Sequence, residues 1–213
     1  MYLPKKYKNF PTAYPENFET LLEGSAREHG HLCPGQVIGV RMALLGLELL
    51  GLEHTRETRE IKKLIVYVEI DRCANDAISY VTGVKLGRRS LKFKDYGIMA
   101  ATFVNLSTEK AFRIVSTESS RETAKAFAPQ GENLHARQLE AYKIMPLSQL
   151  FTVQEVSVNI KAADMPGPSA FKIACENCGI ILRDQKEVRT RGRILCHACA
   201  GTAYYKEKKK ISL

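Results

Sequence analysis

Four cysteines near the end of the chain restrict its folding more than any other feature. They form two CxxC pairs, Cys175 with Cys178 and Cys196 with Cys199, joined by residues 179–195. A CxxC turn places two thiolates on one side of a tetrahedral site, and a hairpin or short helix brings the second pair to meet the first. The spacing predicts a structural zinc site in a small zinc-ribbon or treble-clef module, rather than a redox pair or a disulfide.

The rest of the chain predicts a larger domain of mixed helices and strands. Apolar residues at helical spacing predict helices over 16–28 and 36–52, and a short β-branched run predicts a buried strand over 62–70. Residues 84–97 are expected to form a loop or hairpin. Further strands are predicted at 97–106, 111–116 and 151–160, and further helices at 77–81, 119–128 and 134–145. Helices and strands without a regular βαβ alternation indicate an α+β fold.

A stretch rich in Pro and Gly predicts the boundary between the two parts. We expect an α+β domain over 1–163, a linker over 164–170 and the four-cysteine zinc module over 171–213. A length of 213 residues suits one ordinary domain with a small module attached.

The long apolar helix that begins near Pro34 predicts self-association. It has few polar positions for a helix on a protein surface. Gly39 and Gly46 lie on one of its faces, where they would let another element pack closely. We therefore expect a homodimer formed through the first domain.

Composition indicates a soluble, cytoplasmic protein with no membrane partner. The chain is 45% hydrophobic and 26% charged, and no apolar run has the length of a membrane span. Residues 1–16 lack the apolar core of a signal peptide. In a reducing compartment, the two remaining cysteines, Cys33 and Cys73, are expected to be thiols.

Basic residues exceed acidic ones, with a net charge of +9. Part of the excess positive charge lies in residues 171–213, but a mild excess of this kind usually consists of basic side chains on the solvated surface. Nucleic-acid binding is therefore expected to be weak and to be lost as salt is added. A separate basic stretch either lies in solvent or holds an anionic substrate or cofactor phosphate; it contains Lys85, Arg88, Arg89, Lys92 and Lys94.

The segment HGHLCPG carries candidate ligands. If it is extended, His29, His31 and Cys33 project to one face, because side chains alternate with a period of two. Cys33 stands just before Pro34 and the long helix, where the helix macrodipole favours a thiolate. His31 is the expected imidazole ligand because it is nearer to Cys33, with His29 as a second ligand or an orienting group.

Cys73 is the other candidate in this part of the chain. It follows the predicted buried strand and precedes a helix, with Asp71 and Asp76 close in sequence. Together with Cys33 and a histidine, it would form a soft metal site, or one of the two cysteines would act as an activated nucleophile. The alternative is that both thiols are simply packed and the histidines cap a helix.

Three segments, HGHLCPGQVIGVRMA, VEIDRCANDAISYVTGVKLG and LKFKDYGIMAATF, occur in an order that resembles the FmdE family, named for a component of formylmethanofuran dehydrogenase. The resemblance covers most of residues 20–160. It implies an α+β core with a mixed sheet and flanking helices, thioredoxin-like in outline and commonly dimeric. It also implies that the positions of His31, Cys33 and Cys73 share one groove, and that some members end in a small zinc module. GRRSL replaces a more glycine-rich loop of the family.

The resemblance links the chain to molybdenum- or tungsten-dependent formylmethanofuran dehydrogenase of methanogenic carbon metabolism, whose catalytic centre belongs to other subunits. We therefore expect a zinc-containing, metal-binding accessory protein, with dehydrogenase subunits as candidate partners. Two alternatives remain open. The chain would be a thiol-dependent enzyme that uses Cys33 or Cys73, or a nucleic-acid-binding regulator that uses the basic zinc module.

Overall fold

The computed structural model describes residues 17–52, 59–209 and 211. Residues 1–16, for which the absence of a signal peptide is a prediction from sequence, lie outside the described part. The chain divides into two compact units, 1–159 and 160–213. Among the described residues, no helix combines the length and apolar character needed to cross a membrane.

The first unit is built on a five-stranded mixed sheet in the order β2-β1-β3-β4-β5. β1 and β2 run parallel, and the other neighbouring pairs are antiparallel. The parallel pair needs a crossover, which is supplied by α3 and the 3₁₀ helix η3. The strands are β1 (Leu64–Val68), β2 (Leu91–Phe93), β3 (Ala100–Asn105), β4 (Ala111–Ser116) and β5 (Phe151–Val156).

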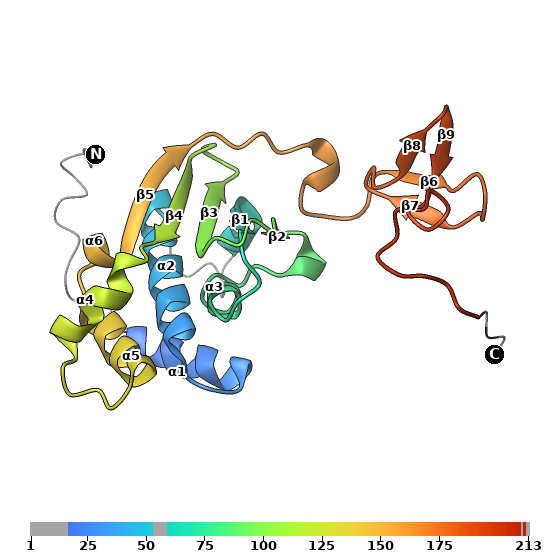
Figure 1. The fold of residues 1–213 in the computed structure, drawn as a ribbon. Helices are drawn as coiled ribbons and strands as arrows, with labels where there is room; N and C mark the ends of the chain where they lie inside the picture. Colours follow the sequence, from blue (N-terminus) through green and yellow to red (C-terminus); the bar gives the residue numbers. More distant parts are fainter. Residues whose placement is uncertain (1–16, 53–58, 210, 212–213) are drawn as a thin grey trace. The chain divides into compact units, whose positions relative to one another are not determined.

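Helices cover the sheet and form most of the core (Figure 1). The central helix, α2, packs on β3 and β4 and also contacts α1, α3 and α5. The helices are α1 (Phe18–His29), α2 (Pro34–Leu50), α3 (Ala74–Thr82), α4 (Ser119–Phe127), α5 (Leu134–Ile144) and α6 (Leu147–Leu150), with 3₁₀ helices η2 (Arg59–Lys63) and η3 (Leu86–Arg88).

Nearly every residue of α2 is buried inside its own unit. The apolar character of this helix is thus explained without a second copy of the chain, because α1, α3, α5 and the sheet cover it. The helix therefore gives no support to a homodimer, which stays a prediction that the family resemblance favours. The two glycines of α2 do allow close packing: a Cβ on Gly39 would lie 2.5 Å from the Ala74 carbonyl oxygen, and one on Gly46 would lie 2.5 Å from the Phe103 ring.

The second unit is a small module of two hairpins. β6 (Lys172–Ala174) pairs with β7 (Ile181–Arg183), and β8 (Val188–Thr190) pairs with β9 (Arg193–Leu195). Cys175 follows β6 and Cys196 follows β9, so each CxxC turn begins where a strand ends. The short helix η4 (Ala162–Asp164) precedes the hairpins.

The predicted fold class is confirmed: a mixed sheet flanked by helices, followed by a four-cysteine module. One predicted segment differs. Residues 84–97 form neither a hairpin nor only a loop, because Leu91–Phe93 joins the sheet beside β1. The partner strand is distant in sequence and parallel, so no local turn pattern signals this pairing.

Candidate metal centres

The four cysteines of the second unit lie together. Their Sγ atoms are all within 4.8 Å of one another, and Cys175 and Cys196 are buried in the small core of the module. Backbone N–H groups point at the sulfurs: Cys196 donates to Cys175 Sγ at 3.2 Å, and Cys199 donates to Cys196 Sγ at 3.4 Å. Donors of this kind stabilise thiolates, so the turns are arranged for anionic sulfur.

Two of these thiols have pKa values that shift in opposite directions. Backbone N–H groups of Cys178 and Cys196 lower the pKa of Cys175 to about 6. Asn177 donates to Cys199 Sγ and favours its thiolate, but the neighbouring sulfurs of Cys196 and Cys178 raise the pKa of Cys199 to about 12. Four adjacent thiolates repel one another unless a cation lies between them, and a divalent metal would remove this conflict.

A second group forms in the first unit, at the ends of three helices. His29 is the last residue of α1, Cys33 is the N-cap of α2, and Cys73 is the N-cap of α3. One ligand atom from each of these residues lies within 4.8 Å of those of the other two. Below, we call these three residues the His29–Cys33–Cys73 group.

Small residues bring the two thiols of the group together. A Cβ on Gly35 would lie 2.9 Å from the Cys73 Cβ and 3.7 Å from the Cys33 Sγ. One turn later, Gly39 lies against the backbone of Ala74. With side chains at these positions, α2 and α3 could not approach so closely, and Cys33 and Cys73 would be pushed apart.

The two ring nitrogens of His29 have different surroundings. The ring Nδ1 and the Asp76 Oδ2 are 2.7 Å apart, which fits donation of the Nδ1 proton to the carboxylate. Nε2 is buried and has no hydrogen-bond partner among the described residues. A carboxylate that fixes one nitrogen leaves a lone pair on the other, as in histidines that bind metals. A metal bound at Nε2 would explain why this buried nitrogen has no hydrogen-bond partner among the described residues.

The structure places His29, and not His31, in the group. α1 extends to His29 and ends at Gly30, whose φ of 100° lies in the left-handed region. The segment is therefore not uniformly extended, and side-chain alternation does not apply to it. The His31 ring instead lies beside the His29 ring, with centroids 4.7 Å apart. Asp71 also lies outside the group and contacts Arg72 at 3.5 Å.

Burial raises the pKa of Cys73, and the hydrogen bond with Cys33 and the charge of Cys33 raise it further. The Asp76 carboxylate acts in the same direction. Without a metal, Cys73 is therefore a poorer nucleophile at neutral pH than an ordinary cysteine. A bound divalent cation would reverse this effect.

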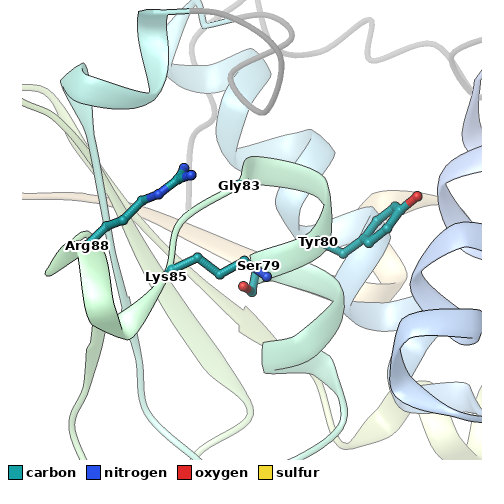
Figure 2. A pocket seen from close by; sticks show the side chains of 5 residues that line it. All are labelled: Ser79, Tyr80, Gly83, Lys85 and Arg88. Carbon is teal, nitrogen blue, oxygen red and sulfur yellow. The ribbon is translucent and has the colours of Figure 1, made fainter.

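The predicted basic stretch contributes to a small pocket of about 220 Å³ at the C-terminal end of α3 (Figure 2). Lys85 and Arg88 line it together with Ser79, Tyr80 and Gly83. Lys85 also pairs with Glu28 on α1 at 3.0 Å. Positive side chains at the end of a helix offset the partial charge of its last carbonyls, so this arrangement has an ordinary structural explanation.

The two sites and the sheet together define an α+β protein with two clusters suited to metal ions. The sequence pattern of the family described as "FmdE, Molybdenum formylmethanofuran dehydrogenase operon" matches residues 28–152, more than half of the chain. The chain belongs to the FmdE family, as the three sequence segments predict.

Two relatives add to this comparison. A protein of Archaeoglobus fulgidus named "Probable S-adenosyl-L-methionine-binding protein" is 28% identical over 212 residues, which cover 92% of this chain and 57% of that protein. This chain thus spans little more than half the length of that relative. The crystal structure of a protein from Syntrophus aciditrophicus, titled "tungsten formylmethanofuran dehydrogenase subunit e (fmde)-like protein", matches with a TM-score of 0.58 and 18% identity, over 89% of this chain and 95% of that one. At that identity, the match shows a shared fold.

Proposed function

We propose that this chain is a metal-binding accessory protein of the FmdE family with two distinct metal sites. The His29–Cys33–Cys73 group would hold one divalent metal at a functional site. Cys175, Cys178, Cys196 and Cys199 would hold a structural zinc. The observation that carries the first assignment is the buried, unpartnered Nε2 of His29 within a group of two thiols, with Nδ1 fixed by Asp76.

The donor types distinguish the roles of the two sites. Four thiolates complete a tetrahedral shell and leave no position for another ligand, which is typical of structural zinc. One imidazole and two thiolates suit zinc or another borderline metal and leave a fourth position open. A metal held there would act as a Lewis acid on the molecule that occupies this position. Asp76 would keep His29 in the correct tautomer and orientation.

The family description supports dehydrogenase subunits as candidate partners, since it places the family with a molybdenum formylmethanofuran dehydrogenase operon. A role in methanogenic carbon metabolism, a cytoplasmic location and a homodimer belong to the same proposal. The raised pKa of Cys73 disfavours the alternative in which this thiol acts as a free nucleophile in the metal-free protein.

Metal analysis of anaerobically purified full chain tests the proposal. We expect about two metals per chain in the wild type and about one in Cys33→Ser or Cys73→Ser, because each substitution removes a thiolate from a site with only three protein ligands. Circular dichroism should show that both variants remain folded. Equal content of one metal in the wild type and both variants would contradict the functional site and favour the thiol-dependent alternative.

A further inference from the structure

A second tier of polar side chains lies one helical turn away from the His29–Cys33–Cys73 group. Ser25 is on α1, one turn before His29, and Gln36 is in the first turn of α2, just after Cys33. Both side chains are buried, with relative exposures of 1% and 0%. The tier thus lies on α1 and α2, two of the three helices that carry the candidate ligands.

Gln36 donates hydrogen bonds to the backbone of both thiol-bearing residues. Its backbone N–H donates to the Cys33 carbonyl oxygen at 2.9 Å. Its side-chain Nε2 donates to the Cys73 carbonyl oxygen at 2.7 Å. One residue therefore links the N-cap of α2 to the N-cap of α3.

Ser25 completes the connection to α1. Its hydroxyl donates to the Gln36 Oε1. The Cys73 carbonyl oxygen can only accept, so Nε2 must be the end of the carboxamide that faces Cys73. The Ser25 hydroxyl, which can donate or accept, then donates to the other end. A buried carboxamide without partners would be costly, and here both of its ends are used.

We propose that Ser25 and Gln36 are positioning residues that set the distance and orientation of Cys33 and Cys73 for metal binding. This inference rests on the proposed function of the His29–Cys33–Cys73 group. Among the described residues, the Gln36 side chain makes its hydrogen bonds to the Cys73 carbonyl oxygen and the Ser25 hydroxyl, and to neither ligand sulfur. It acts through the Cys73 carbonyl, which also accepts hydrogen bonds from the first-turn N–H groups of Asp76 and Ala77. Fixing this carbonyl fixes the start of α3, and with it Cys73 and the Asp76 that orients His29.

Cobalt binding to the full chain tests the proposal. One equivalent of zinc is added first to fill the four-cysteine site, and Co²⁺ is then titrated while its thiolate charge-transfer absorption is recorded. Cys33→Ser supplies the baseline for cobalt held elsewhere. In Gln36→Met, which has a similar side-chain length and no hydrogen-bonding amide, we expect the cobalt affinity to fall about tenfold or more, with an altered absorption spectrum.

A matched variant separates positioning from simple stability. Asn105 is another buried amide that donates to a backbone carbonyl, that of Leu50, and it lies at the C-terminal end of β3. Asn105→Leu should lower the melting temperature but leave the cobalt affinity and spectrum unchanged. Ser25→Ala removes the hydrogen bond to Oε1 but leaves the one from Nε2 to the Cys73 carbonyl, so it should weaken cobalt binding less than Gln36→Met does.

The outcomes are distinguishable. If the wild type takes up no cobalt beyond the Cys33→Ser baseline, both the functional site and the positioning role are overturned. If the wild type binds cobalt and both Gln36→Met and Ser25→Ala bind it with the same affinity and spectrum, only the positioning role is overturned. Should Gln36→Met fail to fold, Ser25→Ala decides the question.

Discussion

His29 and His31 are two positions apart, but their surroundings differ. The His29 side chain is 14% exposed and bonded to Asp76, whereas His31 is exposed and contacts the His29 ring. A ligand needs a fixed orientation, and within the described part of the chain Asp76 provides it for His29 and no hydrogen bond does so for His31.

We therefore predict that removing the His29 ring changes the metal content and that removing the His31 ring does not. His29→Ala should lower the metal content from about two to about one per chain, because the functional site loses a ligand. His31→Ala should retain both metals. Elemental analysis of the two variants, with circular dichroism as a folding control, makes this comparison. Loss of a metal from His31→Ala with retention in His29→Ala would reverse the assignment.

The raised pKa of Cys73 leads to a second prediction at this scale. A thiol is alkylated as its thiolate, so raising the pKa above the ordinary value of 9.0 shifts the reaction to higher pH. In chelator-treated protein, the midpoint of iodoacetamide labelling at Cys73, followed by mass spectrometry, should lie above pH 9.0. Added zinc should protect the same cysteine, because the metal occupies the sulfur.

Urea-unfolded chain provides the control for that measurement. Unfolding removes the burial and the contact with Cys33, so the midpoint should return to the ordinary value. A midpoint in the folded, metal-free protein well below that of the unfolded chain would identify Cys73 as an activated nucleophile and support the thiol-dependent alternative.

At the scale of elements, the contact between α2 and α3 brings Cys33 close to Cys73. Gly39→Ala would place a methyl group 2.5 Å from the Ala74 carbonyl oxygen and 2.6 Å from the Ala77 Cβ. Backbone cannot yield as a flexible side chain does, so we expect a destabilisation of about 1–3 kcal/mol in chemical unfolding. Metal affinity of the functional site should fall as well, because the helices must separate.

Gly87→Ala is the matched control for this substitution. A Cβ at Gly87 would meet no atom within 4 Å, and the residue does not have a positive φ. Its unfolding midpoint should stay close to that of the wild type. If Gly39→Ala were equally well tolerated, close packing of α2 on α3 would not be what holds the two thiols together.

At the scale of the whole molecule, the two compact units should respond separately to loss of the C-terminal metal. A segment as short as residues 171–213 rarely folds without a metal or disulfide to hold it together. Cys196→Ser should therefore release zinc from the module and expose these residues to protease. The first unit, which has its own core, should keep its protection. Limited proteolysis with mass spectrometry of the fragments makes this test. Cys33→Ser, which changes a candidate ligand of the first unit and leaves the module intact, is the variant for comparison. A module that stayed protected without metal would count against a structural zinc.

The sequence alone determined most helices and strands of the first unit and the four-cysteine cluster of the second. Periodicity located the main helices and the strands β1, β3, β4 and β5, because local patterns of apolar residues decide these elements. The two CxxC pairs identified a four-cysteine cluster because their ligands are set by short turns. Three ordered segments also predicted the family that the comparison confirms.

Only the tertiary structure decided how the first-unit group is assembled. Sequence proximity favoured His31, but the left-handed turn at Gly30 ends α1 in such a way that His29 joins Cys33 and Cys73. The link from Gln36 to the Cys73 carbonyl, and the pairing of β2 with β1, connect residues far apart in the chain. Such contacts depend on how helices and strands pack in three dimensions, and no local spacing encodes them.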